Sequence, residues 1–360
     1  MNNIKRIQEA LGSRGFDAIL LTDEKNQRYA TGFAFTDGAV VVGREKAWLL
    51  TDSRYIEAAE KIAGGCCEVQ MFDREHSLSS LISAALAENG TDTLAAEDQK
   101  MSHAQWSAWE KLLGRSFVGA GDLMMGLRAR KSDEEIASMI RAQRISEKAL
   151  EEVLHIIKPG MTEKEVMAEL VYYMLKFGSE GNSFDPIVVT GKNTSMPHGV
   201  PGDTVIRDGD FITMDFGSLS DGYCSDMTRT VAVGHATEEM KTVYYTVLEA
   251  QLAGIAAARS GIPGKLIDKA ARDVIEKAGY GAYFGHGFGH SLGLDIHEPP
   301  MAGPRGEALM EVNDLCSAEP GIYLPGKFGV RIEDVTIIRP EGAEVITRAP
   351  KSELIVLNNG

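Results

Sequence analysis

Cysteine is scarce in this sequence of 360 residues, which contains four cysteines and no Cys-x-x-Cys pair. Cys66 and Cys67 are adjacent, whereas Cys224 and Cys316 stand alone. Disulfide frameworks need paired cysteines and persist in oxidising compartments. We therefore expect a cytoplasmic protein that is held together by packing and not by covalent links.

Positive charge and long apolar runs are also in short supply. Lys and Arg number 37 against 52 Asp and Glu, so the formal net charge is −15. Nucleic acids and anionic lipids bind clustered Lys and Arg, so neither is an expected partner. No stretch approaches the ~20 apolar residues of a membrane span. The N-terminal segment MNNIKRIQEALGSRGFDAIL has no apolar core of the signal-peptide type.

The composition is that of a globular protein, with 44% hydrophobic and 25% charged residues, and the length favours two domains. The first third alternates segments of strand and helix character. We expect strands at 16–21 and 39–51, and helices at 53–63 and 77–88. The second strand segment breaks at Gly43–Lys46, which predicts a hairpin. This alternation is typical of an α/β domain.

Four glycines between residues 114 and 126 interrupt the helical pattern and predict a domain boundary there. The expected domains are residues 1–126 and 127–360. Two helices should follow the boundary, because two capping boxes pair a hydroxyl residue with a Glu three positions later. These boxes are Ser132 with Glu135 and Thr162 with Glu165.

Two acidic residues are expected to face each other in a first hairpin, DGDFITMDFGSLSDGYCSDMTRTVAVG. If its turn centres between Ser220 and Asp221, then Asp215 lies opposite Asp226. Like charges that face each other across a ladder are destabilising. A cation between them would reverse that effect.

A second hairpin repeats the arrangement in AEPGIYLPGKFGVRIEDVTII. Folding this segment about Gly326 places Glu319 opposite Glu333. Taken singly, each of these acids is typical of a solvated strand face. Because the pairing occurs twice, in apolar segments punctuated by glycine, the two hairpins together predict a cation site.

Three histidines lie in a glycine-rich segment, GHGFGHSLGLDIHEPP, and His198 lies in MPHGVPGD. Glycine lets the backbone approach a ligand or a metal closely. One imidazole with four carboxylates makes a hard, mostly oxygen site, which is typical of bound Mn²⁺, Co²⁺, Fe²⁺ or Zn²⁺ and not of a structural zinc held by thiolates. Two divalent ions would neutralise four carboxylates, and two ions ~3.5–4 Å apart can share a hydroxide nucleophile. The remaining histidines would then donate protons or bind an oxyanion.

These residues, in this order, resemble the "pita-bread" metallopeptidases of family M24, in the branch of Xaa-Pro aminopeptidases and Xaa-Pro dipeptidases (prolidases). The resemblance rests on Asp215 and Asp226 in DFGSLSDGYCSDMTRT, His290 in GHSLGLDIHE, Glu319 in EPGIY and Glu333 in GVRIED. LLTDSRY resembles the N-terminal domain of that family, and LRARKSDEEI resembles the usual start of its catalytic domain. The implied fold is α/β (α+β), with a creatinase-like N-terminal α/β domain followed by a pita-bread catalytic domain.

The resemblance implies a role for each of these residues. Asp215 and Asp226 would hold one divalent ion, Asp226, His290 and Glu319 the other, and Glu333 would bridge both. Mn²⁺ is the first choice, with Co²⁺, Zn²⁺ or Fe²⁺ as alternatives. The implied catalytic residues are His198, His297 and Glu319, with Glu319 as general base. The implied substrate-binding residues are His286, Arg331 and Tyr323. The family usually has Gly after the metal histidine, and this chain has Ser291 there, but the ligand itself is intact.

The expected reaction is hydrolysis of the Xaa-Pro bond at the N-terminus of short peptides, with a metal-bridging hydroxide as nucleophile. This bond resists most proteases, because its nitrogen carries no hydrogen and the proline ring holds φ at about −65°. We expect an aminopeptidase that acts on peptides with proline at the second position. By resemblance, we also expect a homodimer.

Several alternatives are weighed against this expectation. The main one is a dipeptidase, whose pocket closes beyond the proline. Methionine aminopeptidases generally lack the long N-terminal domain, and creatinases resemble a metal-free version of the fold without the five ligands. A non-catalytic pita-bread binding protein would have lost ligands, whereas this sequence keeps them together with His198 and His297.

Overall fold

The computed structural model describes residues 2–357 and divides the chain into two compact units, Met1–Arg128 and Ala129–Gly360. Among these described residues, no helix combines the length and the apolar character that crossing a membrane requires.

The N-terminal unit is built on one mixed sheet of six strands. The strands are β1 (Ala18–Leu21), β2 (Gly38–Gly43), β3 (Ala47–Thr51), β4 (Glu68–Met71), β5 (Leu94–Ala96) and β6 (Val118–Gly119). Their order is β4-β3-β2-β1-β5-β6, with antiparallel pairing in β1–β2 and β2–β3 and parallel pairing elsewhere. The predicted hairpin at 39–51 is therefore confirmed as β2–β3.

Helices surround this sheet. They are α1 (Ile4–Arg14), α2 (Glu24–Thr31), α3 (Ile56–Ala63), α4 (Leu78–Glu88) and α5 (His103–Leu113), and α6 (Leu123–Ala129) follows β6 at the boundary between the two units. The predicted helices at 53–63 and 77–88 are confirmed as α3 and α4. Helix α6 begins inside the glycine-rich segment that showed little helical pattern. Burial of Leu123 and Met124 outweighs the low helix propensity of Gly126 there.

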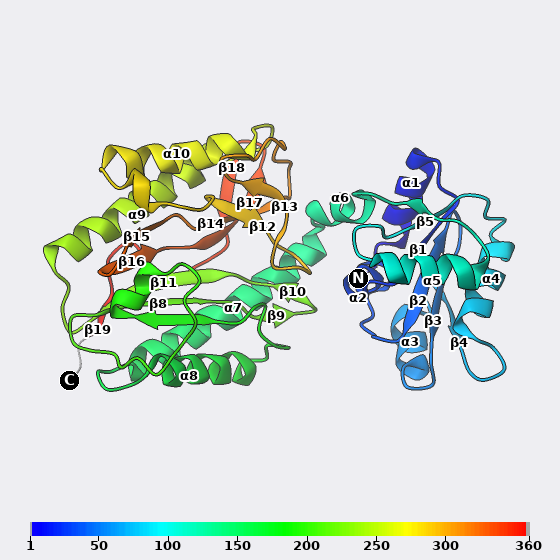
Figure 1. Cartoon of the computed structure of the whole chain (residues 1–360), viewed down its shortest axis with the longest axis horizontal. Helices are drawn as coiled ribbons and strands as arrows, with labels where there is room; N and C mark the ends of the chain where they lie inside the picture. The colour runs from blue at the N-terminus through cyan, green and yellow to red at the C-terminus, as the bar shows by residue number, and fades with distance from the viewer. Residues whose placement is uncertain (1, 358–360) are drawn as a thin grey trace. The chain divides into compact units, whose positions relative to one another are not determined.

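The helices of the C-terminal unit form two pairs on opposite sides of its strands (Figure 1). They are α7 (Asp133–Ile156), α8 (Glu163–Lys176), α9 (Glu238–Ala257) and α10 (Gly264–Lys277), with short 3₁₀ turns η1 (Gly191–Ser195) and η2 (Gly281–Tyr283). Both predicted capping boxes are confirmed, at Ser132 with Glu135 and at Thr162 with Glu165.

The strands between these helix pairs form curved sheets and hairpins. They are β7 (Ile187–Thr190), β8 (Phe211–Phe216), β9 (Leu219–Ser220), β10 (Tyr223–Cys224), β11 (Met227–Val233), β12 (Gly289–Ser291), β13 (Glu298–Ala302), β14 (Leu315–Ala318), β15 (Gly321–Leu324), β16 (Phe328–Arg331), β17 (Asp334–Arg339), β18 (Gly342–Val345) and β19 (Val356–Leu357). One sheet has the order β19-β11-β8-β7 and another β14-β17-β18, and β9–β10, β12–β13 and β15–β16 are two-stranded. One apolar core packs α7 and α8 on the first sheet, and a second packs α9 and α10 on the opposite side.

The first acidic hairpin has a different register from the predicted one. Thr228, not Asp226, stands opposite Asp215 in the β8–β11 ladder. The turn falls one residue later than expected, at Asp221 and Gly222, whose φ values of 50° and 75° suit a tight hairpin turn. The residue opposite Asp215 therefore lies two positions after Asp226. Because side chains alternate between the two faces of a strand, Asp226 stays on the same face as Asp215.

The second acidic hairpin has the predicted register. Gly321 pairs with Arg331 on one side of the two acids, and Ala318 pairs with Asp334 on the other. Both pairings continue one register, which places Glu319 opposite Glu333. Gly326 occupies the turn with a φ of 75°, a conformation that glycine adopts without strain.

Candidate active site

A pocket of about 390 Å³ in the C-terminal unit is lined by all five predicted metal ligands. They are Asp215, Asp226, His290, Glu319 and Glu333. The same pocket is lined by His198, His286, His297 and Arg331, whereas the buried Tyr323 is not among the described residues that line it. The ligand residues come from four separate parts of the unit: β8, the residue before β11, β12, and the β14–β17 region.

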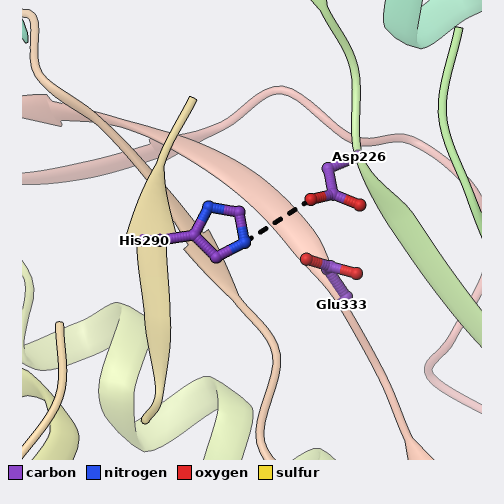
Figure 2. Close-up of side chains that lie close together, drawn as sticks. All are labelled: Asp226, His290 and Glu333. Atoms are coloured by element: carbon purple, nitrogen blue, oxygen red, sulfur yellow. Dashed lines mark ion pairs between the residues drawn. The ribbon is translucent and has the colours of Figure 1, made fainter. Parts of the chain in front are cut away.

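Three of the five predicted ligands gather most tightly. Asp226, His290 and Glu333 point toward one another (Figure 2), and one ligand atom from each lies within 4.8 Å of the other two. The His290 Nε2 atom is 3.7 Å from Asp226 Oδ2. All three side chains are buried. This arrangement of one nitrogen and two carboxylates can hold a divalent cation.

The other two predicted ligands border this cluster and have protein partners of their own. Glu319 Oε1 lies 3.3 Å from His290 Nε2. Asp215 Oδ2 accepts a hydrogen bond of 2.5 Å from the Arg331 guanidinium. The second oxygen of Asp215 is buried and accepts no hydrogen bond from any residue within 2–357.

A close approach of two strands brings His290 to Glu319. A Cβ atom at Gly289 would collide with the Ser317 carbonyl oxygen, so only glycine lets β12 lie this near β14. The His290 amide then donates to Ser317 Oγ at 3.0 Å, and that hydroxyl donates to Glu319 Oε1 at 3.2 Å. No role for Ser317 was predicted from the sequence, although the strand period of two places Ser317 on the same face as Glu319.

Thr228 is a second residue that sequence reasoning missed. Its hydroxyl donates to Glu333 Oε2 at 2.7 Å and accepts from Arg331 Nε at 3.0 Å. Its carbonyl accepts from the Glu333 amide at 3.1 Å. The register error explains the omission, because Thr228 occupies the position opposite Asp215 that had been expected for Asp226.

The shifted pKa values in the cluster favour the protonated forms of Asp226, Glu333 and His290, and the ionised form of Glu319. Burial first, and then the charge of Asp215, raise the pKa of Asp226 well above its usual range. Burial and the charge of Asp226 likewise raise the pKa of Glu333. Burial by itself would lower the pKa of His290. The hydrogen bond and charge of Glu319 and the charge of Asp226 outweigh burial and raise that pKa to about 9. The same pairing overcomes the burial of Glu319 and lowers its pKa to about 2.

These observations fit a bound cation. Buried carboxylates that repel one another keep their protons unless another positive charge is present. The unpartnered oxygen of Asp215 is a further free acceptor in the same place. One imidazole and four carboxylates form the hard donor set that Mn²⁺, Fe²⁺, Co²⁺ or Zn²⁺ accepts. The residues present therefore suit the divalent metal ions of a metallopeptidase.

Three predicted substrate-binding residues form one hydrogen-bonded chain beside the cluster. Arg331 donates to the Tyr323 hydroxyl at 2.9 Å, and that hydroxyl lies 2.9 Å from His286 Nε2. Burial lowers the pKa of His286, so its ring is neutral and accepts from Tyr323 while Nδ1 donates to Gly287. Burial raises the pKa of Tyr323 to about 12, which keeps its phenol protonated. The substrate contacts expected of these residues stay predictions.

The two predicted catalytic histidines are exposed on the pocket wall. His198 lies in the loop after η1, and His297 immediately precedes β13. The His297 ring lies 4.4 Å from the His290 ring, centroid to centroid. Burial, followed by the charge of His290, lowers the pKa of His297, which leaves a neutral imidazole at neutral pH.

We expect the metal-stripped protein to release protons when it binds Mn²⁺. At neutral pH His290, with a pKa of about 9, carries a proton that the ion must displace, and the raised pKa values of Asp226 and Glu333 act in the same direction. Raising the pH from about 6 to about 8 should therefore strengthen binding, by up to ~10-fold per unit for each displaced proton. Calorimetry in two buffers of different ionisation enthalpy measures the release. An affinity that does not change with pH would contradict the expectation.

Comparison with known proteins identifies both parts of the chain. Residues 137–340 match the sequence pattern of the family described as "Metallopeptidase family M24". Residues 3–130 match the "Creatinase/Prolidase N-terminal domain". Among named relatives, "Uncharacterized peptidase YqhT" of Bacillus subtilis (strain 168) is 38% identical over 355 residues, which span 98% of this chain and 99% of the relative.

Solved structures resemble the whole chain. The "Xaa-Pro dipeptidase from Bacillus anthracis" has 41% sequence identity and a TM-score of 0.93, with 99% of each chain covered. The X-Pro aminopeptidase from Thermotoga maritima MSB8 has 35% identity and a TM-score of 0.92, with 97% of this chain and 99% of that one covered. The predicted fold, a creatinase-like N-terminal domain followed by a pita-bread catalytic domain, is thereby confirmed. This chain belongs to metallopeptidase family M24.

Proposed function

We propose that this chain is a two-metal Xaa-Pro aminopeptidase, which hydrolyses the bond before a proline at the second position of short peptides. The observation that carries the proposal is the buried Asp226–His290–Glu333 cluster, which lies in a pocket with Glu319 and Asp215. The names of similar proteins support the Xaa-Pro specificity, because relatives and solved structures are named Xaa-Pro dipeptidases or aminopeptidases.

Five side chains would hold the two divalent ions, for which Mn²⁺ is our choice: Asp215, Asp226, His290, Glu319 and Glu333. When bound, such ions polarise a carbonyl and lower the pKa of a coordinated water to about 7. Exchange of the His290 proton for an ion would leave the imidazole neutral, which is the form that ligates metals.

The charge of the pocket suits an exopeptidase. Five acids line it, namely Asp185, Asp215, Asp226, Glu319 and Glu333, against one permanent cation, Arg331. Two divalent ions would neutralise the four ligand carboxylates, which leaves Asp185 as the lining acid outside the metal site that can attract the α-ammonium of a free peptide N-terminus. A blocked N-terminus would lose this attraction.

Apolar side chains offer a surface for the proline ring. Phe184, Ile187, Ile296 and Met301 line the pocket together with the polar residues. Met301 leaves 49% of its surface exposed, so a substrate can reach its side chain. A proline ring has no N–H to satisfy, so contact with such a surface costs no hydrogen bond.

The chain's own residues can move and hold protons at the scissile bond. The pairing with His290 lowers the pKa of Glu319 to about 2, and a bound cation would keep this carboxylate ionised after the His290 proton leaves, as a general base requires. His297, neutral at that pH, can donate a ring N–H to the oxygen that becomes negative in the transition state. His198 lines the same pocket and can serve the leaving proline nitrogen or the same oxygen.

Aminopeptidase activity is favoured by the shortage of cations. A dipeptidase must bind the carboxylate of the proline, and such binding is usually the task of an Arg or a Lys. Among the described residues that line the pocket, Arg331 is the single Arg or Lys. Its guanidinium already binds Asp215, Tyr323 and the Pro197 carbonyl. Dipeptidase activity is the second candidate, because the similar structure at 41% identity carries that name.

Three substrates separate these two activities: Ala-Pro, Ala-Pro-NH₂ and Ala-Pro-Ala, each assayed for release of alanine by the Mn²⁺-loaded protein. The amide removes the carboxylate without lengthening the chain. For an aminopeptidase, kcat/KM should be similar for Ala-Pro-NH₂ and Ala-Pro-Ala. For a dipeptidase, kcat/KM should be at least ~10-fold lower for Ala-Pro-NH₂ than for Ala-Pro, because the amide cannot make the charged hydrogen bond of the carboxylate. Failure to cleave all three, with metal bound, would overturn the proposed function. The cytoplasmic location and the homodimer stay predictions.

A further inference from the structure

The Lys131 ammonium is buried in the C-terminal unit, close to the metal site but outside it. Its side chain is 0% exposed and lies between the end of α6 and the start of α7. Its Nζ atom donates to Ser291 Oγ at 3.1 Å and to Glu298 Oε2 at 3.2 Å. Its backbone amide donates to the Asn313 carbonyl. A buried lysine needs such partners, because an unpaired ammonium is very costly away from water.

The two partners of Lys131 belong to the two strands of one hairpin. Ser291 ends β12 and Glu298 begins β13, and the two residues are paired. The register shifts between His290 and Ser291, so the ladder is irregular at this point. Pro299 and Pro300 follow in β13, and proline has no N–H to donate. The ammonium of Lys131 therefore joins the two strands where their ladder is irregular and where the prolines donate no hydrogen bond.

This hairpin carries two residues of the proposed site. The Ser291 carbonyl accepts from His290 Nδ1 at 3.1 Å, which leaves Nε2 directed at Asp226 and Glu319. His297 is the residue just before Glu298, and its ring contacts the His290 ring. Groups that fix the second nitrogen of a ligand histidine set its tautomer and its direction.

We propose that Lys131 is a positioning residue for the metal site, which holds His290 and His297 in place by binding Ser291 and Glu298. The proposal rests on the proposed function, in which His290 binds metal and His297 acts on the substrate. Lys131 touches neither metal nor substrate; it acts through the hairpin.

Two variants test the role without leaving a buried charge alone. K131M/E298Q removes both charges and keeps the side-chain volumes nearly unchanged, whereas K131R keeps the charge and its donors. The matched control is L170A, which opens a cavity in the core of α8 and destabilises the unit away from this hairpin. All proteins are stripped of metal and titrated with Mn²⁺ by calorimetry, at one temperature well below every melting transition.

We expect K131M/E298Q to bind Mn²⁺ about 10- to 100-fold more weakly than the wild type. K131R should recover most of that loss, and L170A should bind like the wild type. At saturating Mn²⁺, the double variant should lose kcat more than it changes KM, because His297 is displaced as well.

Wild-type Mn²⁺ affinity and kcat in K131M/E298Q would overturn the proposal. An equal loss of affinity in L170A would also overturn it, because general destabilisation would then explain the effect. These outcomes are distinct from failure of the proposed function. A wild-type protein that binds Mn²⁺ but cleaves no Xaa-Pro peptide contradicts the function, while the affinities still report on Lys131.

Discussion

A Glu319→Gln variant is expected to lose about 10²- to 10⁴-fold in kcat while it keeps its fold. The amide has nearly the volume of the carboxylate, so the contact with Ser317 can persist. It cannot accept a proton from water, and it removes the negative charge that pairs with His290. The measurement is kcat for Ala-Pro-Ala at saturating Mn²⁺, with circular dichroism to show that the variant is folded.

Glu344→Gln is the control for this substitution. Glu344 is an exposed acid that pairs with Arg339 on β17 and β18, away from the pocket. Exposed ion pairs contribute little to stability, so this variant should retain the kcat of the wild type. If Glu319→Gln kept more than ~10% of that kcat, Glu319 would not be the general base.

Removal of divalent ions with a chelator is expected to abolish peptidase activity, and Mn²⁺ is expected to restore it. The reason is the cluster itself, in which Asp226 and Glu333 are buried beside each other and need a cation to stay ionised. Each bound Mn²⁺ ion, at ~100 times its Kd, should stabilise the folded protein by about 2.7 kcal/mol. For a unit of this size, that corresponds to a rise in Tm of roughly 5–10 °C.

An Asp226→Asn variant completes this experiment. It removes one ligand charge from the cluster, so activity should fall even at high Mn²⁺ and the rise in Tm should shrink. Asp203→Asn is the control, because Asp203 is exposed and pairs with Lys164 at the surface. Activity that survives a large excess of chelator would contradict a metal-dependent reaction.

Local patterns in the chain were sufficient for much of the fold. The helix starts at Ser132 and Thr162 follow from capping boxes, because the hydrogen bonds of a cap join residues three positions apart. The pairing of Glu319 with Glu333 follows from a turn that glycine marks clearly at Gly326. The pairing of Asp215 with Asp226 was wrong, because Ser, Asp and Gly in SLSDG allow more than one turn position and a hairpin register depends on the turn.

The candidate site, too, was predictable from the sequence only in part. The five ligand types and their order could be read along the chain, because acids in apolar strands and histidines among glycines stand out from their surroundings. The residues that hold those ligands in place could not be predicted from the sequence. Lys131 meets Ser291 and Glu298 across more than 150 positions of chain, and Thr228 meets Glu333 across 105. Residues so far apart share no local period, so their contact depends on how the sheets curve and pack and becomes visible in the folded chain alone.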